Sequence, residues 1–202
     1  ERFNAGDHLG AVAEVARAES ISRVLYPADS TEAGQELRLR QEYFFVSASL
    51  QDLLRRHLNM HKDLRNLPDA AAIQLNDTHP SIAVAELMRL LVDQHEVPWE
   101  KAWELTVGTL AYTNHTLLPE ALETWPVALM ERMLPRHMQI IYLINAYHID
   151  ALRAKGLHDF DVLRAVSLIE EDNGRRVRMG NLAFLGSHSV NGVSALHSKL
   201  MK

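Results

Sequence analysis

The chain has 202 residues, of which 47% are hydrophobic, and its formal net charge is −5. This composition predicts one globular unit, residues 1–202, with a sizeable core, and the lack of cysteine excludes disulfide bonds and thiol chemistry. The negative charge argues against nucleic acid as a partner, and no apolar run approaches the roughly 18 residues of a membrane helix. We therefore expect a cytoplasmic protein that binds neither nucleic acid nor membrane.

The first third of the chain is predicted to be mainly helical. Residues 7–17 favour a short helix, and residues 23–31 favour a loop in which Asp29 and Ser30 are turn residues. From about residue 34 to residue 58, apolar side chains recur at helical spacing. This recurrence predicts one long helix.

The first of two short polar segments in the middle of the chain is residues 76–80, which read NDTHP. It follows residues 71–75, an apolar run of strand length, and precedes apolar residues at helical spacing. A proline is tolerated in the first helical turn, so we expect the helix to begin at Pro80. Asp77 or Thr78 is then expected to accept hydrogen bonds from the amides that open this helix.

The second polar segment is residues 112–116, which read YTNHT. It follows a helix predicted to begin near Pro98, and it is too polar to be core. The apolar face of that helix is predicted to consist of Trp99, Trp103, Val107 and Leu110. In open α/β sheets, ligands bind beyond the carboxyl ends of the strands, so both polar segments are candidate ligand loops.

The last third of the chain predicts two more helices and a second strand-loop-helix unit. Helical spacing runs through residues 140–152, and another helix is expected over residues 159–168. A strand is expected at residues 176–179 and a buried one at residues 182–185. A glycine-punctuated loop over residues 186–192 then leads to a final helix. Because both ends of the chain fall within helix-forming sequence, we expect a segment of a longer protein.

The polar loops offer carboxylates, imidazoles and amides, namely Asp77, His79, Asn114, His115, Glu120, Glu123, His188 and Asn191. Such groups suit a neutral ligand rich in hydroxyl groups, because each hydroxyl needs a donor and an acceptor.

Three alternatives remain open on these residues alone. In the first, Asp77 and His79 only cap the following helix, and this explanation is about as good as a functional one. A glycosidase that uses two carboxylates is a second alternative, in which Asp77 would act together with Glu120 or Glu123. A metal-dependent hydrolase that uses Asp77, His79 and His115 is a further alternative, although the spacing of these residues matches no metal motif.

Four motifs in this order resemble the glycogen and maltodextrin phosphorylase family. They are SRVLYP at 22–27 with ELRLRQEYF at 36–44, IQLNDTHP at 73–80, YTNHTLLPEALETWP at 112–126, and SHSVNGV at 187–193 with LHS at 196–198. The resemblance implies a helix-rich α/β fold that is part of the N-terminal Rossmann-like domain of a two-domain GT-B-type glycosyltransferase. The C-terminal domain would then lie outside residues 1–202.

Members of this family cleave the terminal α-1,4 bond of glycogen or maltodextrin with inorganic phosphate and release α-glucose 1-phosphate. The resemblance therefore implies that the parent protein is such an enzyme, a homodimer that uses pyridoxal 5′-phosphate. The lysine that binds this cofactor would lie outside this chain, and the isolated segment is expected to be inactive. A non-catalytic α-glucan-binding module remains the alternative.

The resemblance also assigns roles to individual residues. It makes His115 the catalytic residue, whose imidazole contacts the 6-hydroxyl of the glucosyl unit and whose carbonyl lies near the developing positive charge. The other residues implied to bind substrate are Asp77 and His79 at the acceptor-side subsite, Val193 through its backbone, and Asp29 and Ser30 in a gating loop. Thr31 and Glu32 replace an aromatic pair of many animal members, which favours a bacterial type.

Overall fold

The computed structural model of the chain describes residues 2–116, 118, 122–172 and 174–200. The chain divides into two compact units, Glu1–Phe45 and Val46–Lys202. Among the described residues, no helix is both long and apolar enough to cross a membrane.

The first unit contains helix α1 (His8–Arg23) and the first half of helix α2 (Glu32–His61). Helix α1 begins after Asp7, whose carboxylate accepts a hydrogen bond from the amide of Gly10 at 2.9 Å. The predicted loop between the helices is confirmed. Helix α1, however, continues six residues beyond the predicted end at residue 17. Gln41 of α2 donates hydrogen bonds to two carbonyl oxygens at the end of α1 and just beyond it.

The second unit is built on a parallel sheet of three strands, in the order β1-β2-β6. These are β1 (Ile73–Asn76), β2 (Leu110–Asn114) and β6 (Ser189–Gly192). A second, antiparallel sheet has the order β3-β5-β4 and consists of β3 (Thr124–Pro126), β4 (Ile169–Glu170) and β5 (Arg176–Arg178). The helix-rich α/β class predicted from the sequence is therefore confirmed.

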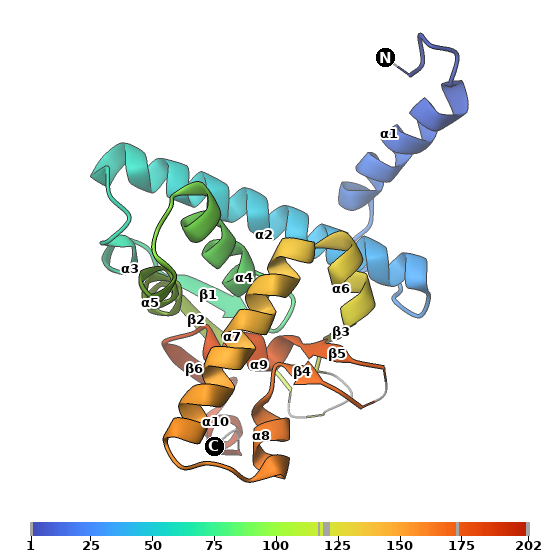
Figure 1. Cartoon of the computed structure of the whole chain (residues 1–202). Coiled ribbons are helices and arrows are strands. Elements are labelled where there is room, and N and C mark those ends of the chain that lie inside the picture. Colours follow the sequence, from blue (N-terminus) through green and yellow to red (C-terminus); the bar gives the residue numbers. More distant parts are fainter. Residues whose placement is uncertain (1, 117, 119–121, 173, 201–202) are drawn as a thin grey trace. The chain divides into compact units, whose positions relative to one another are not determined.

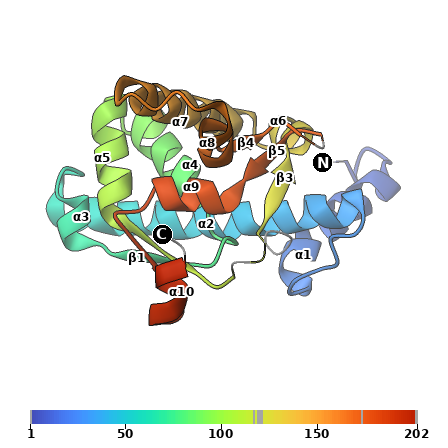
Figure 2. The ribbon, with the colours of Figure 1, turned by 90° about the horizontal axis from the view of Figure 1, so that it is seen from below.

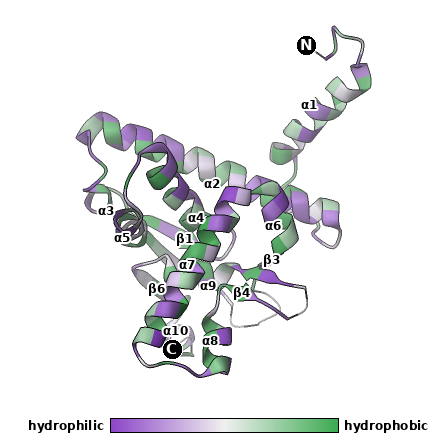
Figure 3. Cartoon of the chain, viewed as in Figure 1, coloured by the Kyte–Doolittle hydropathy of each residue, from purple (hydrophilic) through white to green (hydrophobic). Residues whose placement is uncertain are grey.

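Helices connect and cover these strands (Figure 1). In chain order they are α3 (Leu67–Ala70), α4 (Ala83–Arg89) with its π-helical continuation η1 (Leu90–Gln94), α5 (Trp99–Thr109), α6 (Val127–Met133), α7 (Pro135–Ala154), α8 (Phe160–Val166), α9 (Met179–Leu185) and α10 (Ala195–Leu200). Helix α4 packs against α5 and α7, and α9 packs against β2. Figure 3 shows predominantly hydrophobic residues along α4 and the middle of α7, where the core lies.

Burial alternates along the central strand of the parallel sheet. The side chains of Leu110, Tyr112 and Asn114 are buried, whereas those of Ala111 and Thr113 are half-buried. This alternation follows from the period of two in a strand. Figure 2 shows α4, α5 and α9 on one side of β1 and β2. The buried residues of β2 therefore face these helices.

A buried ionic cluster joins three helices of the second unit. Glu86 of α4 is fully buried and accepts hydrogen bonds from Ser47 at 2.6 Å and Arg89 at 2.7 Å. Its second oxygen also lies 2.5 Å from Nε2 of His137 on α7. Burial acts to raise the pKa of Glu86, but the hydrogen bonds from Arg89, His137 and Ser47 outweigh it and hold the pKa at about 2. The cluster therefore keeps a buried carboxylate charged.

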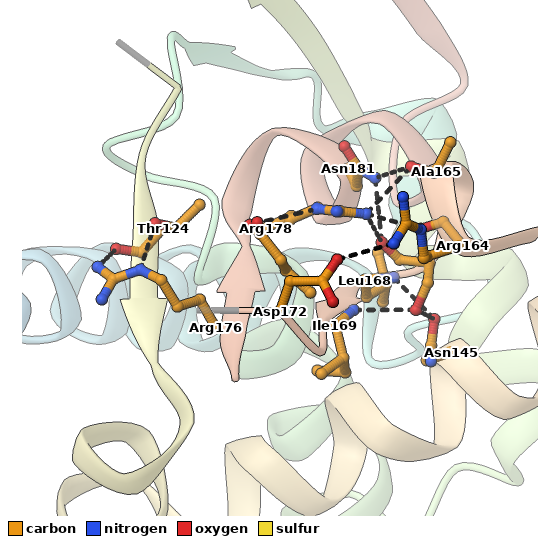
Figure 4. A network of polar contacts seen from close by, with 12 residues as sticks. Thr124, Asn145, Arg164, Ala165, Leu168, Ile169, Asp172, Arg176, Arg178 and Asn181 are labelled. Atoms are coloured by element: carbon orange, nitrogen blue, oxygen red, sulfur yellow. Dashed lines mark hydrogen bonds and ion pairs between the residues drawn. The ribbon is translucent and has the colours of Figure 1, made fainter. Parts of the chain in front are cut away.

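A second polar network holds the end of α8 (Figure 4). Arg178 donates to the carbonyl oxygens of Arg164 and Ala165 at 2.8 and 3.2 Å, and Asn181 donates to that of Ser167 at 3.1 Å. These carbonyls belong to the last turn of α8 and the residue after it, which have no partner within the helix. Oδ1 of Asn145 on α7 accepts a hydrogen bond from the amide of Leu168, the following residue, at 2.8 Å. The network thus fixes the connection between α8 and β4.

Three predictions about the last third of the chain and helix α5 are wrong. Residues 182–185 form part of helix α9 and not a strand, because a short apolar run has no period that separates the two. The predicted loop over residues 186–192 contains strand β6, which pairs with β2. The buried face of α5 is Ala102, Leu105, Thr106 and Thr109, whereas both tryptophans are only half-buried and line a surface groove with Tyr147.

Candidate functional site

The carboxyl ends of β1, β2 and β6 meet at one edge of the parallel sheet. Asn76 is the register partner of Thr113, and Asn114 is the partner of Gly192. The segment after each strand therefore emerges at the same edge. The sequence predicted a loop at this edge after β1, and the parallel pairing confirms it. The second predicted loop, residues 112–116, is wrong in part, because Tyr112, Thr113 and Asn114 are the last three residues of β2.

The turn after β1 is built around Asp77. This residue has a φ of 66°, in the left-handed region that aspartate tolerates better than most side chains. Its amide donates to the carbonyl of Thr113 at 3.0 Å, and its carboxylate accepts from the amide of Thr78 at 2.7 Å. The turn is thus attached to β2 and held by its own side chain.

The predicted capping of the next helix is wrong. Helix α4 begins at Ala83, after Ile82, and no side chain caps it. The polypeptide makes an extra turn first, in which the carbonyl of Thr78 accepts the amide of Ser81 at 3.0 Å and the carbonyl of Pro80 accepts that of Ala83 at 2.9 Å. Backbone carbonyls therefore take the role that the sequence gave to Asp77 or Thr78.

The exposed imidazole of His115 lies at the end of β2. Its Nε2 is 2.5 Å from Oδ1 of Asn76 at the end of β1. Because an amide oxygen only accepts hydrogen bonds, this contact places the ring proton on Nε2. The side chain is therefore oriented across the edge of the sheet and remains accessible to a ligand.

The prediction that residues 112–116 are too polar for the core is wrong, because Tyr112 and Asn114 are buried with their polar atoms bonded. Nδ2 of Asn114 donates to the hydroxyl of Tyr112 at 2.9 Å. Its Oδ1 accepts from the amide of Thr116 at 3.1 Å and lies 2.9 Å from Nε2 of His197 in α10. Burial raises the pKa of Tyr112, the hydrogen bond from Asn114 lowers it, and the charge of Asp77 raises it, with a net increase.

The opposite face of the sheet carries a row of polar side chains. Gln74 donates to the hydroxyl of Thr113 at 2.8 Å, and this hydroxyl donates to Oδ1 of Asn191 at 3.1 Å. Sequence reasoning missed Gln74 and Thr113 as members of this row. The period of two along each strand places them on the face that carries Asn76 and could have indicated them.

The structure places the other predicted site residues as follows. His79 lies in the turn after β1, with Nδ1 3.7 Å from a carboxylate oxygen of Glu123. Val193 directly follows β6 and is exposed. Asp29 and Ser30 belong to the first unit, where Asp29 forms an ion pair with Arg38.

Three further predictions about the site have a different outcome. Glu120 falls outside the described residues. His188 is not at this edge, because it precedes β6 and its amide donates to the carbonyl of Leu110 at the start of β2. Within the part of the chain that the structure describes, Asp77, His79 and His115 are not gathered into one set of metal-ligating atoms. The metal-dependent hydrolase therefore has no geometric support from these three residues.

A cavity of about 460 Å³ lies on the α9 side of the sheet edge. Its lining includes Tyr112, Asn114 and Thr116 from the β2 end, with Gly180 and Phe184 from α9. His115 does not line this cavity. The two faces at the end of β2 therefore differ, because one lines a partly open and mainly apolar pocket and the other is exposed and polar.

The side chains at this edge suit a neutral polar ligand. Among the described residues that make hydrogen bonds there, the groups are amides, hydroxyls, imidazoles and the carboxylate of Asp77. Amides and imidazoles can both donate to and accept from hydroxyl groups. None of these groups is a lysine or arginine. The set fits a sugar and does not fit a phosphate or an imine-bound cofactor.

A parallel sheet with a polar carboxyl edge defines an α/β protein with its ligand-binding groups beyond the strand ends. The chain matches the carbohydrate phosphorylase family over residues 1–202, and it belongs to that family.

Among its relatives are the glycogen phosphorylases of Haemophilus influenzae and Synechocystis sp., 56% and 54% identical over 98% and 100% of the chain. The liver form of glycogen phosphorylase from Bos taurus is 55% identical over 99% of the chain. The chain covers 24% of each of these relatives, about a quarter of their length. Because bacterial and mammalian relatives are similar to nearly the same degree, identity does not distinguish the bacterial type expected from Thr31 and Glu32.

Proposed function

We propose that the protein containing this chain is an α-glucan phosphorylase, which transfers the terminal glucosyl unit of glycogen or maltodextrin to inorganic phosphate. The observation that carries the proposal is the meeting of Asn76 and His115 at the carboxyl edge, within the segments that match the family. This chain would supply the sugar-binding half of the active site. The rest of the longer protein would supply the groups that bind phosphate.

In this proposal His115 contacts the glucosyl unit directly. Its position at an exposed strand end, with Nε2 engaged by Asn76, leaves Nδ1 and the backbone carbonyl of the residue for substrate. A carbonyl dipole beside the anomeric carbon stabilises the positive charge that develops as the glycosidic bond breaks. Asp77 and His79, in the turn beside it, are proposed to contact the acceptor-side sugar, and Val193 to contact glucose through its backbone.

The remaining family properties are part of the same proposal. We infer that residues 1–202 belong to the N-terminal, Rossmann-like domain of a two-domain GT-B-type protein, a cytoplasmic homodimer in which Asp29 and Ser30 belong to a gating loop. The pyridoxal phosphate expected for the family would supply a phosphate group able to exchange protons with the substrate phosphate. The polar edge offers no lysine among its described hydrogen-bonding groups, and the resemblance to the family implies that the cofactor is bound by residues outside this chain, so we derive no step through it.

The test is phosphorolysis of maltoheptaose by the full-length protein, with glucose 1-phosphate as the measured product. His115→Ala is expected to lower kcat/KM by about 10²-fold or more, the usual loss when one positioned polar contact to a transition state is removed. His188→Ala is the matched control, because this histidine lies at the opposite edge of the same sheet. The control is expected to retain the wild-type rate.

The products formed in this assay distinguish between the competing functions. Release of glucose in place of glucose 1-phosphate would indicate a hydrolase and overturn the proposal. A full-length protein that binds maltoheptaose but forms neither product would instead be a glucan-binding module. Full activity of His115→Ala would remove the role assigned to this residue.

A further inference from the structure

We propose that Asn114 is a positioning residue that holds His115 in its working orientation. The inference rests on the proposed function, because it assigns to a buried neighbour the task of placing the side chain that contacts sugar. Asn114 itself is only 6% exposed and points away from the open face on which His115 lies. It therefore acts through the polypeptide backbone.

The hydrogen bonds of Asn114 bracket His115 along the chain. Its side chain bonds to the hydroxyl of Tyr112, two residues before it, and to the amide of Thr116, two residues after it. A third contact reaches Nε2 of His197, 83 residues further on. One side chain thus ties the end of β2, the loop beyond it and helix α10 to one point.

The direction of each hydrogen bond is determined by its partners. The amide of Thr116 can only donate, so the atom of Asn114 that it meets is the oxygen. His197 must then donate its Nε2–H to the same oxygen, and the NH₂ group is left for the hydroxyl of Tyr112. The side-chain amide therefore has one orientation, in which three of its hydrogen-bonding positions are used.

His115 is consequently held at two points. Its backbone lies between the two residues that Asn114 fixes, and its ring tip is held by Asn76. Without Asn114, the amide of Thr116 and the hydroxyl of Tyr112 lose their partners, and the loop is free to move. A displacement of about 1 Å at a substrate-contacting group can lower a rate by about 10²-fold.

The test is a double-mutant cycle in the full-length enzyme, with kcat and KM measured separately. Asn114→Ala alone is expected to lower kcat by about 10- to 10²-fold with a smaller effect on KM, because misplacement weakens transition-state contacts more than ground-state binding. In the His115→Ala background the same substitution is expected to cost little more. The two effects are non-additive if Asn114 acts through His115.

Asn145→Ala is the matched structural control. Asn145 also uses its amide oxygen to hold a backbone amide and a serine hydroxyl, but it lies on α7 and its hydrogen bonds to other described residues go to Ser167 and Leu168 (Figure 4). It is expected to reduce stability without changing kcat. Additive losses in the cycle would overturn the positioning role of Asn114 while leaving the proposed function intact. A fully active His115→Ala would overturn the positioning role of Asn114 together with the role assigned to His115.

Substitutions at His197 keep the proposal testable if Asn114→Ala fails to fold. His197→Gln retains an N–H that can donate to Asn114, whereas His197→Leu does not. We expect His197→Gln to retain most of the wild-type kcat and His197→Leu to lose it to the extent that Asn114→Ala does. Equal activity of the two variants would contradict the proposal.

Discussion

Nε2 of His115 lies 2.5 Å from Oδ1 of Asn76, and this contact joins the ends of two neighbouring strands across 39 residues of sequence. It exists because β1 and β2 are parallel and paired in a register that ends both at one edge. A candidate substrate-binding side chain is thereby oriented by a residue that need not touch substrate itself.

The first prediction concerns this contact. Asn76→Ala removes the acceptor for Nε2 of His115 and is expected to lower kcat/KM for phosphorolysis by about 10-fold, less than the loss of the imidazole itself. Gln74→Ala is the control on the same strand and face, because Gln74 bonds to Thr113 and not to His115. Equal losses in the two variants, measured in the full-length enzyme, would argue against a specific role for Asn76.

The second prediction is a pH dependence of stability that arises from Glu86. Its pKa of about 2 in the folded protein lies below the ordinary value of 4.5, so the unfolded chain binds the proton more tightly. The carboxylate therefore stabilises the fold above about pH 4.5, and this stabilisation is lost as the pH falls towards 2. The loss is on the order of 3 kcal/mol, from about 1.4 kcal/mol per pKa unit.

Urea unfolding of the wild type and of Glu86→Gln at several pH values measures this contribution. The difference between the two proteins is expected to shrink as the pH falls from 5 to 2. Glu104→Gln is the control, because Glu104 is exposed and forms an ion pair with Lys101 on the surface. A constant difference between wild type and Glu86→Gln over this range would contradict the assignment.

Local sequence patterns predicted the part of the site that is built on β1, but not the strands β2 and β6. The apolar run before residues 76–80 and the helical spacing after them are short-range signals, and they correctly indicated a strand, a turn and a helix. They also placed a loop at the end of β1, but residues 112–114, which they assigned to a second loop, belong to β2. What they could not supply is strand register, which depends on residues far apart in the chain. The contact between His115 and Asn76 could therefore not be predicted from the sequence.

The buried polar residues were harder to predict for the same reason. Asn114 and Glu86 look like surface residues in the sequence, yet each is buried because its partners arrive from other elements. His197 is 83 residues from Asn114, and His137 is 51 residues from Glu86. No periodicity within a helix or strand encodes such a pairing.

The third prediction concerns the ionisation of Tyr112. Burial raises the pKa of its hydroxyl above the ordinary value of 10, so the folded protein keeps the proton more tightly than the unfolded chain does. The stabilisation that comes from the protonated hydroxyl of Tyr112 is therefore fully present below pH 10 and is lost as the pH rises through the raised pKa. In an ultraviolet titration, Tyr112→Phe is expected to remove a late-titrating phenol. Loss of an ordinary phenol near pH 10 would contradict this expectation.

The fourth prediction concerns the close approach of Gly186, just after α9, to Val84 of α4. A Cβ atom added at Gly186, just after α9, would lie 2.5 Å from a methyl carbon of Val84, which is fully buried. The φ of Gly186 is −82°, so alanine is compatible with the backbone and the conflict is purely steric. Gly186→Ala is therefore expected to lower the free energy of unfolding by about 1–3 kcal/mol, as overpacking does in other cores.

Combining this change with Val84→Ala gives the decisive measurement. Val84→Ala alone opens a cavity, which the new methyl group at position 186 can partly fill, so the double variant should lose less stability than the two single variants together. Gly180→Ala is the control within α9, because its Cβ would meet Thr78 at an ordinary 3.7 Å. Alanine is favoured over glycine within a helix by roughly 1 kcal/mol, so this control should be neutral or stabilising. Strict additivity between positions 84 and 186 in urea unfolding would show that the two residues do not share one packing space.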